Sequence, residues 1–347
     1  MAVGRVVWRL GRTVLAVWAL VSAVFLVSHR DADTAVRLAL PDAADLGRRA
    51  ALDPAREAVA QAAVRRRLGL DLPLFYASRR GPGWAWHGAR NQYHRWARQL
   101  LRGDLGTSFR TGQPVAHRLS TALAVTLPLT GTAAALAVAL ALGLAQALAA
   151  RPRWAGAVRA GLGALQALPL FVVASLLLLT FANPEALAWF PAYGLAGPAA
   201  DPAAGWGLTL AHLVLPVVAL TLAALPELAL QLEATLAQEL GAGYAATARA
   251  KGLSERAVIR RHALRNALLP SLTQLTDLLP ALVAGAVVVE MVFGLPGMGR
   301  LLAEAGAARD YPVLVGGVLL TGAARLFALL LADALYFWAD PRLRWQS

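Results

Sequence analysis

The ionisable residues within or beside long apolar segments of the chain include Asp277, Glu290 and Arg325. A charge inside a membrane-spanning helix is rare, because the bilayer core solvates it poorly, and it usually has a function. An aspartate and an arginine in such segments can pair with each other, line a transport pathway or pair with another subunit. These residues are therefore the first candidates for chemistry.

Depth in the membrane limits a direct pair between Asp277 and Arg325. At about 1.5 Å per residue, Asp277 lies roughly 9 Å and Arg325 roughly 18 Å from the cytoplasmic end of its predicted helix. The difference of about 9 Å exceeds salt-bridge reach unless helix tilt or a water molecule closes it. Pairing, pathway lining and contact with a partner subunit all stay open. Glu290 precedes a predicted external turn, where it borders a substrate entrance or forms a structural hydrogen bond.

The residue inventory argues against a catalytic site. The chain has no cysteine, and its six histidines form no HExxH pair, so we expect no catalytic residue and no metal site. Asp277 is isolated, Asp333 lies near a helix end and no nucleophile has a matched base, which disfavours an intramembrane enzyme. The GLPGMGR string at 294–300 lacks the GK[ST] ending of a phosphate loop, so we expect no directly bound cofactor.

The composition is that of an integral membrane protein. Of the 347 residues, 58% are hydrophobic and only 15% are charged, and the mean hydropathy is +0.54. The net charge of +13 is explained by arginines in loops beside anionic lipid rather than by nucleic-acid binding. We therefore expect the lipid bilayer, and no nucleic acid, as a partner.

Apolar runs predict an all-α fold with about six membrane-spanning helices. The spans are predicted at 13–28, 120–149, 161–182, 206–229, 271–293 and 312–337. Arginines beside alternate ends predict a multi-pass topology with both termini in the cytoplasm and an uncleaved first helix. Four prolines are expected inside helices, where they form kinks: Pro128, Pro169, Pro216 and Pro280.

The polar part between the first two spans predicts an external region. The chain accordingly divides into a first helix at 1–29, an external region at 30–118 and a membrane-spanning core at 119–347 with a cytoplasmic loop at 230–270. The external region places Trp84, Trp86, Tyr93 and Trp96 among arginines. Such a pattern can stack nucleic-acid bases, but an aromatic belt at the membrane interface is the commoner explanation.

A basic island at 244–270 separates two apolar segments. Its six cations place it in the cytoplasm: Arg249, Lys251, Arg256, Arg260, Arg261 and Arg265. Helix-favouring residues precede Gly252, and a new helix start follows at Ser254, so two short helices joined at the glycine are expected. Small residues here can enter a groove on another protein; docking on lipid headgroups is the alternative.

This island and the strings after it resemble a known family. TARAKGLSERAVIRRHALRNALLP, GAVVVEMVFGLPGMGRLL, RDYPV and DPRLR occur in order, preceded by LLRGDLGTSFRTGQPV and HLVLP. Together they resemble the permease subunit of binding-protein-dependent ABC importers of the dipeptide, oligopeptide and nickel group. The resemblance implies the type I importer permease fold in the bacterial cytoplasmic (inner) membrane. It also implies import of peptides by alternating access, with nickel or another small solute as the alternative; a passive channel would not need the loop.

The resemblance assigns partners and site residues as well. It implies a second permease subunit in a heterodimer, an external substrate-binding protein, and two ATPase subunits that use ATP and Mg. The ATPase would contact a coupling loop in which residues 248–253 form the contact helix. The implied coupling residues are Tyr244, Thr247, Ala248, Arg249, Ala250, Lys251, Gly252, Leu253, Ser254, Arg261, Arg265 and Asn266.

The chain departs from the family pattern at several places. Gly243 replaces an acidic residue, Glu233 stands where a basic residue is common, and Leu329 replaces an asparagine. An insertion at about 79–94 enlarges the external region. The departures at 233 and 243 concern the entry side of the coupling loop.

Overall fold

A computed structural model describes residues 2–29, 36, 54–68, 71–80, 83–150, 152–194 and 205–339. These residues are mainly helical, which confirms the all-α class, with one short hairpin in addition. Contacts divide the chain into two compact units, each of which is described by itself. The first unit is built mainly from residues 122–300, and the second from residues 3–121 and 301–324.

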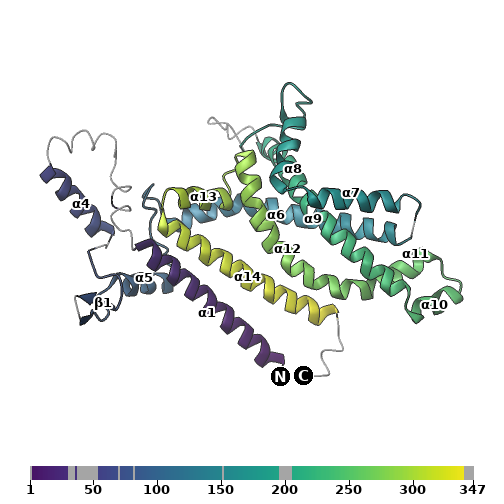
Figure 1. The fold of residues 1–347 in the computed structure, drawn as a ribbon, viewed down its shortest axis with the longest axis horizontal. Coiled ribbons are helices and arrows are strands. Elements are labelled where there is room, and N and C mark those ends of the chain that lie inside the picture. The colour runs from purple at the N-terminus through teal and green to yellow at the C-terminus, as the bar shows by residue number, and fades with distance from the viewer. Residues whose placement is uncertain are drawn as a thin grey trace. The chain divides into compact units, whose positions relative to one another are not determined.

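Figure 1 labels the elements along the chain, and their bounds are as follows. They are α1 (Ala2–His29), α4 (Pro54–Leu68), β1 (Ala77–Arg80), β2 (Gly83–Trp86), α5 (Gln92–Leu101), α6 (Val115–Ala149), α7 (Ala155–Ala167), α8 (Leu170–Leu177), the π-helical turn η1 (Leu178–Ala182), α9 (Gly205–Leu240), α10 (Gly243–Ala250), α11 (Glu255–Val258), the π-helical turn η3 (Ile259–Ala263), α12 (Leu264–Phe293), α13 (Met298–Ala307) and α14 (Tyr311–Ala339). β1 and β2 pair antiparallel, with Ala77 opposite Trp86.

The first unit is organised around α9 and α12, which pack along each other, with α8 against both. Its core is apolar and includes Leu129 of α6, Ala174 of α8, Leu220 of α9 and Phe293 of α12, all at most 2% exposed. Leucine and alanine let the facing helices pack closely, and van der Waals contact of this kind is a main source of association energy between membrane helices. It positions the α10–α11 segment at one end and the α12–α13 turn at the other.

The second unit joins the N-terminal part of the chain to residues 301–324. α14 approaches its neighbours closely because it carries glycines at the contact points. A Cβ at Gly316 would lie 2.9 Å from Val115 and 2.8 Å from Leu119, and a Cβ at Gly322 would lie 2.7 Å from Val17 of α1. The topological division of the sequence at residues 29 and 118 stays a prediction.

Each of the six expected spans overlaps at least one described helix. By length and hydropathy, Val115–Ala149 and Leu210–Leu240 are long and apolar enough to cross a membrane alone. Two bent pairs, Ala155–Ala167 with Leu170–Phe181 and Pro280–Phe293 with Met298–Ala307, qualify if each pair counts as one span. Gly11–Val27 and Tyr311–Ala324 are apolar but shorter. Two to four spans are therefore established by this criterion, and six stays a prediction.

The third expected span differs from the prediction. Instead of one helix at 161–182 with a kink at Pro169, α7 and α8 meet at an angle of 102°. Leu168 is extended, with φ −81° and ψ 127°, and Pro169 caps α8. A proline disfavours helical backbone in the residue before it, so the helix breaks there rather than bending. Pro128, Pro216 and Pro280 lie inside helices as predicted.

Candidate functional site

The segment between α9 and α12 is a compact helical loop. α10 ends at Ala250, and the chain turns through Gly252, whose φ of +81° lies in the left-handed region that favours glycine. Ser254 is extended and starts α11. Two short helices joined at Gly252 are thus confirmed. The expected contact helix at 248–253 is wrong in its bounds, because Lys251 and Leu253 belong to the turn.

α10 has one buried face. Ala245 and Ala248 are 0% and 5% exposed and pack with Val258 of α11, while Leu240 and Leu253 complete this small cluster. Alanine at these positions lets the two helices lie close together. Ala248, which was expected to touch a partner, therefore packs inside the loop.

The opposite side of the loop is open to solvent. Its exposed members include most of the predicted coupling residues, and we call this set the outer face: Tyr244, Ala246, Thr247, Arg249, Ala250, Lys251, Gly252, Ser254, Arg256, Arg260, Arg261, Arg265 and Asn266. Six of these residues are cations; the acidic Glu255 is exposed beside them and pairs with Arg249. The outer face therefore offers small side chains and positive charge to a neighbouring surface.

Arg249 holds the loop in shape. Its Nε and Nη2 donate to the two carboxylate oxygens of Glu255 at 2.9 and 2.8 Å. Its Nη1 donates to the carbonyl of Leu240 at 3.0 Å. The guanidinium thus joins the ends of α9 and α10 to the start of α11, and hydrogen bonding to Glu255 raises the pKa of Arg249. A planar guanidinium suits this two-pronged contact better than a lysine would.

The two departures on the entry side have local partners. Gly243 starts α10, and the hydroxyl of Tyr244 donates to Glu239 at 2.5 Å. Burial, together with this bond, raises the pKa of Tyr244. Glu233 accepts from Arg159 of α7, with Nε at 3.0 Å and Nη2 at 2.5 Å from Oε1. The reversed charge at 233 is therefore matched within the unit by an arginine.

Glu290 lies at the corner between α12 and α13 and is fully buried. Thr126 of α6 donates to its Oε1 at 2.5 Å, and the backbone N–H of Arg300 donates to its Oε2 at 3.0 Å. The Thr126 hydroxyl also accepts from the N–H of Met298 at 2.8 Å. Of the two roles considered for Glu290, the structure shows the hydrogen-bonded one: the carboxylate caps the start of α13.

Two glycines make room for this corner. A Cβ at Gly297 would overlap the carboxylate of Glu290, and a Cβ at Gly299 would overlap the backbone of Val287. Gly294, with a φ of +66°, ends α12 in the left-handed region. The glycines of GLPGMG thus serve the corner rather than a phosphate.

The other predicted intramembrane charges have no described side chains. Asp277 lies in α12 and Arg325 in α14, but both side chains are outside the described part of the structure. Their pairing, pathway lining or contact with a partner stays a prediction.

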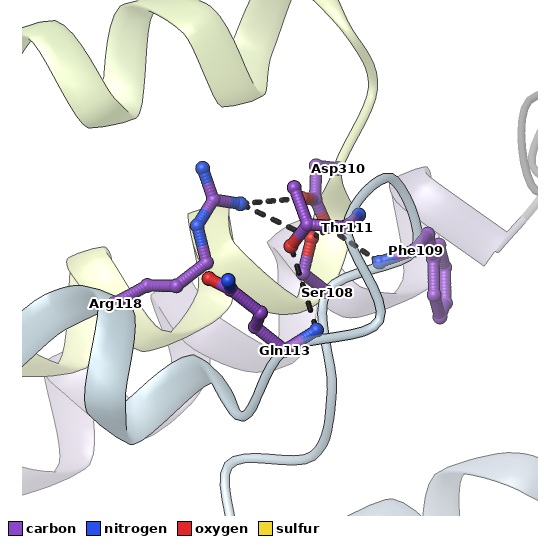
Figure 2. A network of polar contacts seen from close by, with 6 residues as sticks. All are labelled: Ser108, Phe109, Thr111, Gln113, Arg118 and Asp310. Carbon is purple, nitrogen blue, oxygen red and sulfur yellow. Dashed lines mark hydrogen bonds and ion pairs between the residues drawn. The ribbon is translucent and has the colours of Figure 1, made fainter. Parts of the chain in front are cut away.

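A polar network in the second unit was not predicted. Asp310 is 1% exposed; it accepts from Ser108 at 2.5 Å, from the N–H of Phe109 at 3.0 Å and from Arg118 at 3.1 Å. Figure 2 shows these groups converging on the aspartate from the loop before α6 and from α6 itself. The bonds hold that loop against the start of α14. Asp310 lies in RDYPV and Ser108 in LLRGDLGTSFRTGQPV, so both partners lie in strings that carried the family resemblance.

Comparison with known proteins gives several similar chains. The glutathione transport system permease protein GsiC of Salmonella paratyphi A is 34% identical over 303 residues, which cover 85% of this chain and 90% of the relative. The oligopeptide transport system permease protein OppB of Salmonella typhimurium is 33% identical over 257 residues, covering 73% and 80%. A protein of Brucella abortus (strain 2308), provisionally named a peptide transport system permease, is 35% identical over 256 residues, also covering 73% and 80%.

A solved structure and a family model also match. The structure, the methionine ABC transporter MetNI in an inward-facing conformation, has a TM-score of 0.49 and 20% identity, covering 64% of this chain and 96% of that one. Residues 131–345 match the model of the binding-protein-dependent transport system inner membrane component. With this match over more than half its length, and relatives above 30% identity, the chain belongs to the family of inner-membrane permease components of binding-protein-dependent transport systems.

Proposed function

We propose that this chain is one permease subunit of an importer that moves peptides across the bacterial inner membrane. The carrying observation is the outer face of the α10–α11 loop, a preorganised, cationic, small-residue surface at one end of a bundle with apolar spans. The family and the relatives named for peptide, oligopeptide and glutathione transport support the direction and the substrate class. None of those names favours nickel.

In this proposal the outer face is the surface that contacts a separate ATPase subunit. The chain carries no phosphate-loop motif, so ATP and Mg are used by partner subunits. Arg249 and Glu255 keep α10 and α11 as one rigid piece. Because η3 continues directly into α12, a displacement of this piece is passed to a membrane helix as rigid-body motion. Alternating access would follow from this movement.

The complete machine would contain further subunits. We place a second, different permease beside this one, since a peptide-sized pathway needs more helices than one chain supplies. Two ATPases lie on the cytoplasmic side, together with both termini of this chain. A substrate-binding protein delivers peptide from outside. The binding protein would select the substrate.

Uptake by the intact complex tests the proposal. Vesicles containing this chain with a partner permease, two ATPase subunits and a substrate-binding protein should accumulate a labelled dipeptide only when ATP is present on the ATPase side. Lys251→Glu should lower this uptake strongly, because it reverses a charge on the outer face. Arg153→Glu, the same charge reversal at an exposed position between α6 and α7, is the matched control. Uptake that continues without ATP would favour a passive channel and contradict the proposal.

A further inference from the structure

α5 packs its aromatic residues along the C-terminal half of α1. Trp96 stacks on Phe25 with ring centroids 4.5 Å apart and lies 5.9 Å from Trp18. The hydroxyls of Ser22 and Tyr93 are 2.8 Å apart and hydrogen-bonded. All three α1 residues belong to its apolar stretch, Gly11–Val27. α5 therefore packs against the apolar part of α1, the part that is suited to lie in a membrane.

The β1–β2 hairpin is in turn fixed to α5. Tyr93 of α5 contacts Phe75 and Tyr76, which precede β1, at centroid distances of 5.2 and 6.0 Å. Tyr76 bonds His94 at 3.1 Å and stacks with Trp86 of β2 at 6.1 Å. The hairpin and α5 lie beside the upper end of α1 in Figure 1. This chain of contacts sets the position of the hairpin relative to α1.

One face of the hairpin presents two exposed tryptophans. Trp84 is 78% and Trp86 is 75% exposed. They alternate along β2, so they share a face, and their register partners there are Arg79 and Ala77. Ser78 and Ala85 occupy the other face. Large aromatic side chains that are exposed to this extent mark a surface that contacts a membrane or another molecule.

The same region is strongly basic. Residues 71–104 contain six arginines and two aspartates. On α5, Arg95 and Arg98 are exposed, as is Arg102 at its C-terminal cap, whereas Tyr93 and Trp96 contact α1. Tryptophan beside arginine is the pattern of the membrane interface, where the ring sits among headgroups and the cation meets lipid phosphate.

We propose that the face with Trp84 and Trp86, together with the arginines of α5, is an anchor for anionic phospholipid headgroups. Depth favours lipid over a soluble protein. Phe25, which holds α5, lies only about 3 Å along the helix axis from the end of the apolar stretch at Val27. The hairpin tied to it is thus within reach of the interface. The anchor would hold the external region against the membrane beside α1.

Single-cysteine spin labels test this anchor, because the chain has no cysteine of its own. The full-length chain is placed in vesicles of phosphatidylcholine, with and without phosphatidylglycerol, and labelled at Trp84→Cys or Trp86→Cys. Gln113→Cys, in an exposed loop of the same unit, is the control. Collision with oxygen, relative to a water-soluble nickel chelate, should be several-fold higher at 84 and 86 than at 113. Equal access of the nickel chelate at all three positions would overturn the anchor and leave this face for a protein partner.

A second variant tests the charge. Arg95→Gln, Arg98→Gln and Arg102→Gln in combination should abolish the extra depth that phosphatidylglycerol gives to the label at Trp86. The depth in phosphatidylcholine alone should stay as in the parent. A response to phosphatidylglycerol equal to that of the parent would show that these arginines do not bind the headgroups.

Discussion

The α10–α11 loop and the α12–α13 corner each turn the chain between two helices, but they are stabilised by different kinds of contact. Both are turns between helices at a glycine of positive φ, Gly252 and Gly294, and both are closed by a glutamate. In the loop, Glu255 forms a half-exposed ion pair with Arg249. At the corner, Glu290 is fully buried and accepts from the Thr126 hydroxyl and from backbone N–H groups.

The two regions differ in the polar and charged groups that each leaves exposed to a partner protein. The buried corner uses its polar groups internally, so it is rigid and offers little to a partner. The loop buries only alanines and a few apolar side chains and leaves its cations outside. A surface pair is screened by salt and contributes little to folding, whereas an unmade buried hydrogen bond is costly. We therefore expect the corner to determine stability and the loop to determine coupling.

The largest effect is expected from Gly299→Ala. The new Cβ would overlap the backbone of Val287, which cannot move without displacing α12. Overpacking against backbone should cost about 3 kcal/mol or more, so little folded protein is expected. Thermal unfolding in detergent, followed by tryptophan fluorescence, measures this. Gly306→Ala, where a Cβ meets nothing within 4 Å, is the control and should unfold like the parent.

The next largest effect is expected from removal of the buried carboxylate of Glu290. Glu290→Ala leaves the Arg300 N–H and the Thr126 hydroxyl without their acceptor, which should cost about 1–3 kcal/mol for each group. The same unfolding measurement applies, with Glu185→Ala at an exposed position after η1 as the control. Equal unfolding temperatures for the two variants would contradict the capping role of Glu290.

The ion pair of the loop should behave differently. Arg249→Ala and Glu255→Ala should each leave thermal unfolding nearly unchanged but lower ATP-driven uptake several-fold, because α10 and α11 no longer move as one piece. The exchanged pair, Arg249→Glu with Glu255→Arg, should recover part of the uptake; the bond to the Leu240 carbonyl stays lost. If unfolding falls and uptake does not, the roles of the two regions are reversed.

The sequence predicted the positions of the apolar segments and of the Gly252 turn better than it predicted the side-chain contacts between distant residues. Hydropathy placed the apolar segments, and the glycine at 252 marked the turn, because both signals are local. Glu290 and Thr126 are 164 residues apart, and Ser108 and Asp310 are 202 apart. No periodicity links such positions. Glu233 looked like a charge misplaced in its family until the fold brought Arg159 beside it.

Two differences between prediction and structure have a physical cause within reach of the sequence. The break before Pro169 follows from the clash that proline imposes on the preceding residue, whereas Pro128, Pro216 and Pro280 remain inside helices where packing holds them. Ala248 was assigned to a partner although alanine suits a tight internal contact equally well. Which face of α10 is buried depends on Val258, a residue of the next helix.

The smallest effects are expected from substitutions that compare the two faces of α10. Ala246 is exposed and Ala248 is buried, only two residues away. Ala246→Leu should fold normally and weaken binding of the ATPase, whereas Ala248→Leu should loosen the loop by overpacking its interior, at a cost of about 1–3 kcal/mol. Unfolding and co-purification of the ATPase, measured on both variants, separate the faces. Identical behaviour of the two variants would mean that α10 has no distinct outer face.

Protection of the outer face by an ATPase tests the central claim most directly. A single cysteine at Ala246, in a chain that otherwise has none, is exposed to a maleimide reagent in membranes that contain the chain with or without its ATPase subunits. A cysteine at Gln113, in the second unit, reports any general change in reactivity. We predict that the ATPase slows labelling at 246 by an order of magnitude or so and leaves 113 unchanged. Equal labelling at 246 with and without the ATPase would contradict the assignment of this loop as the coupling site.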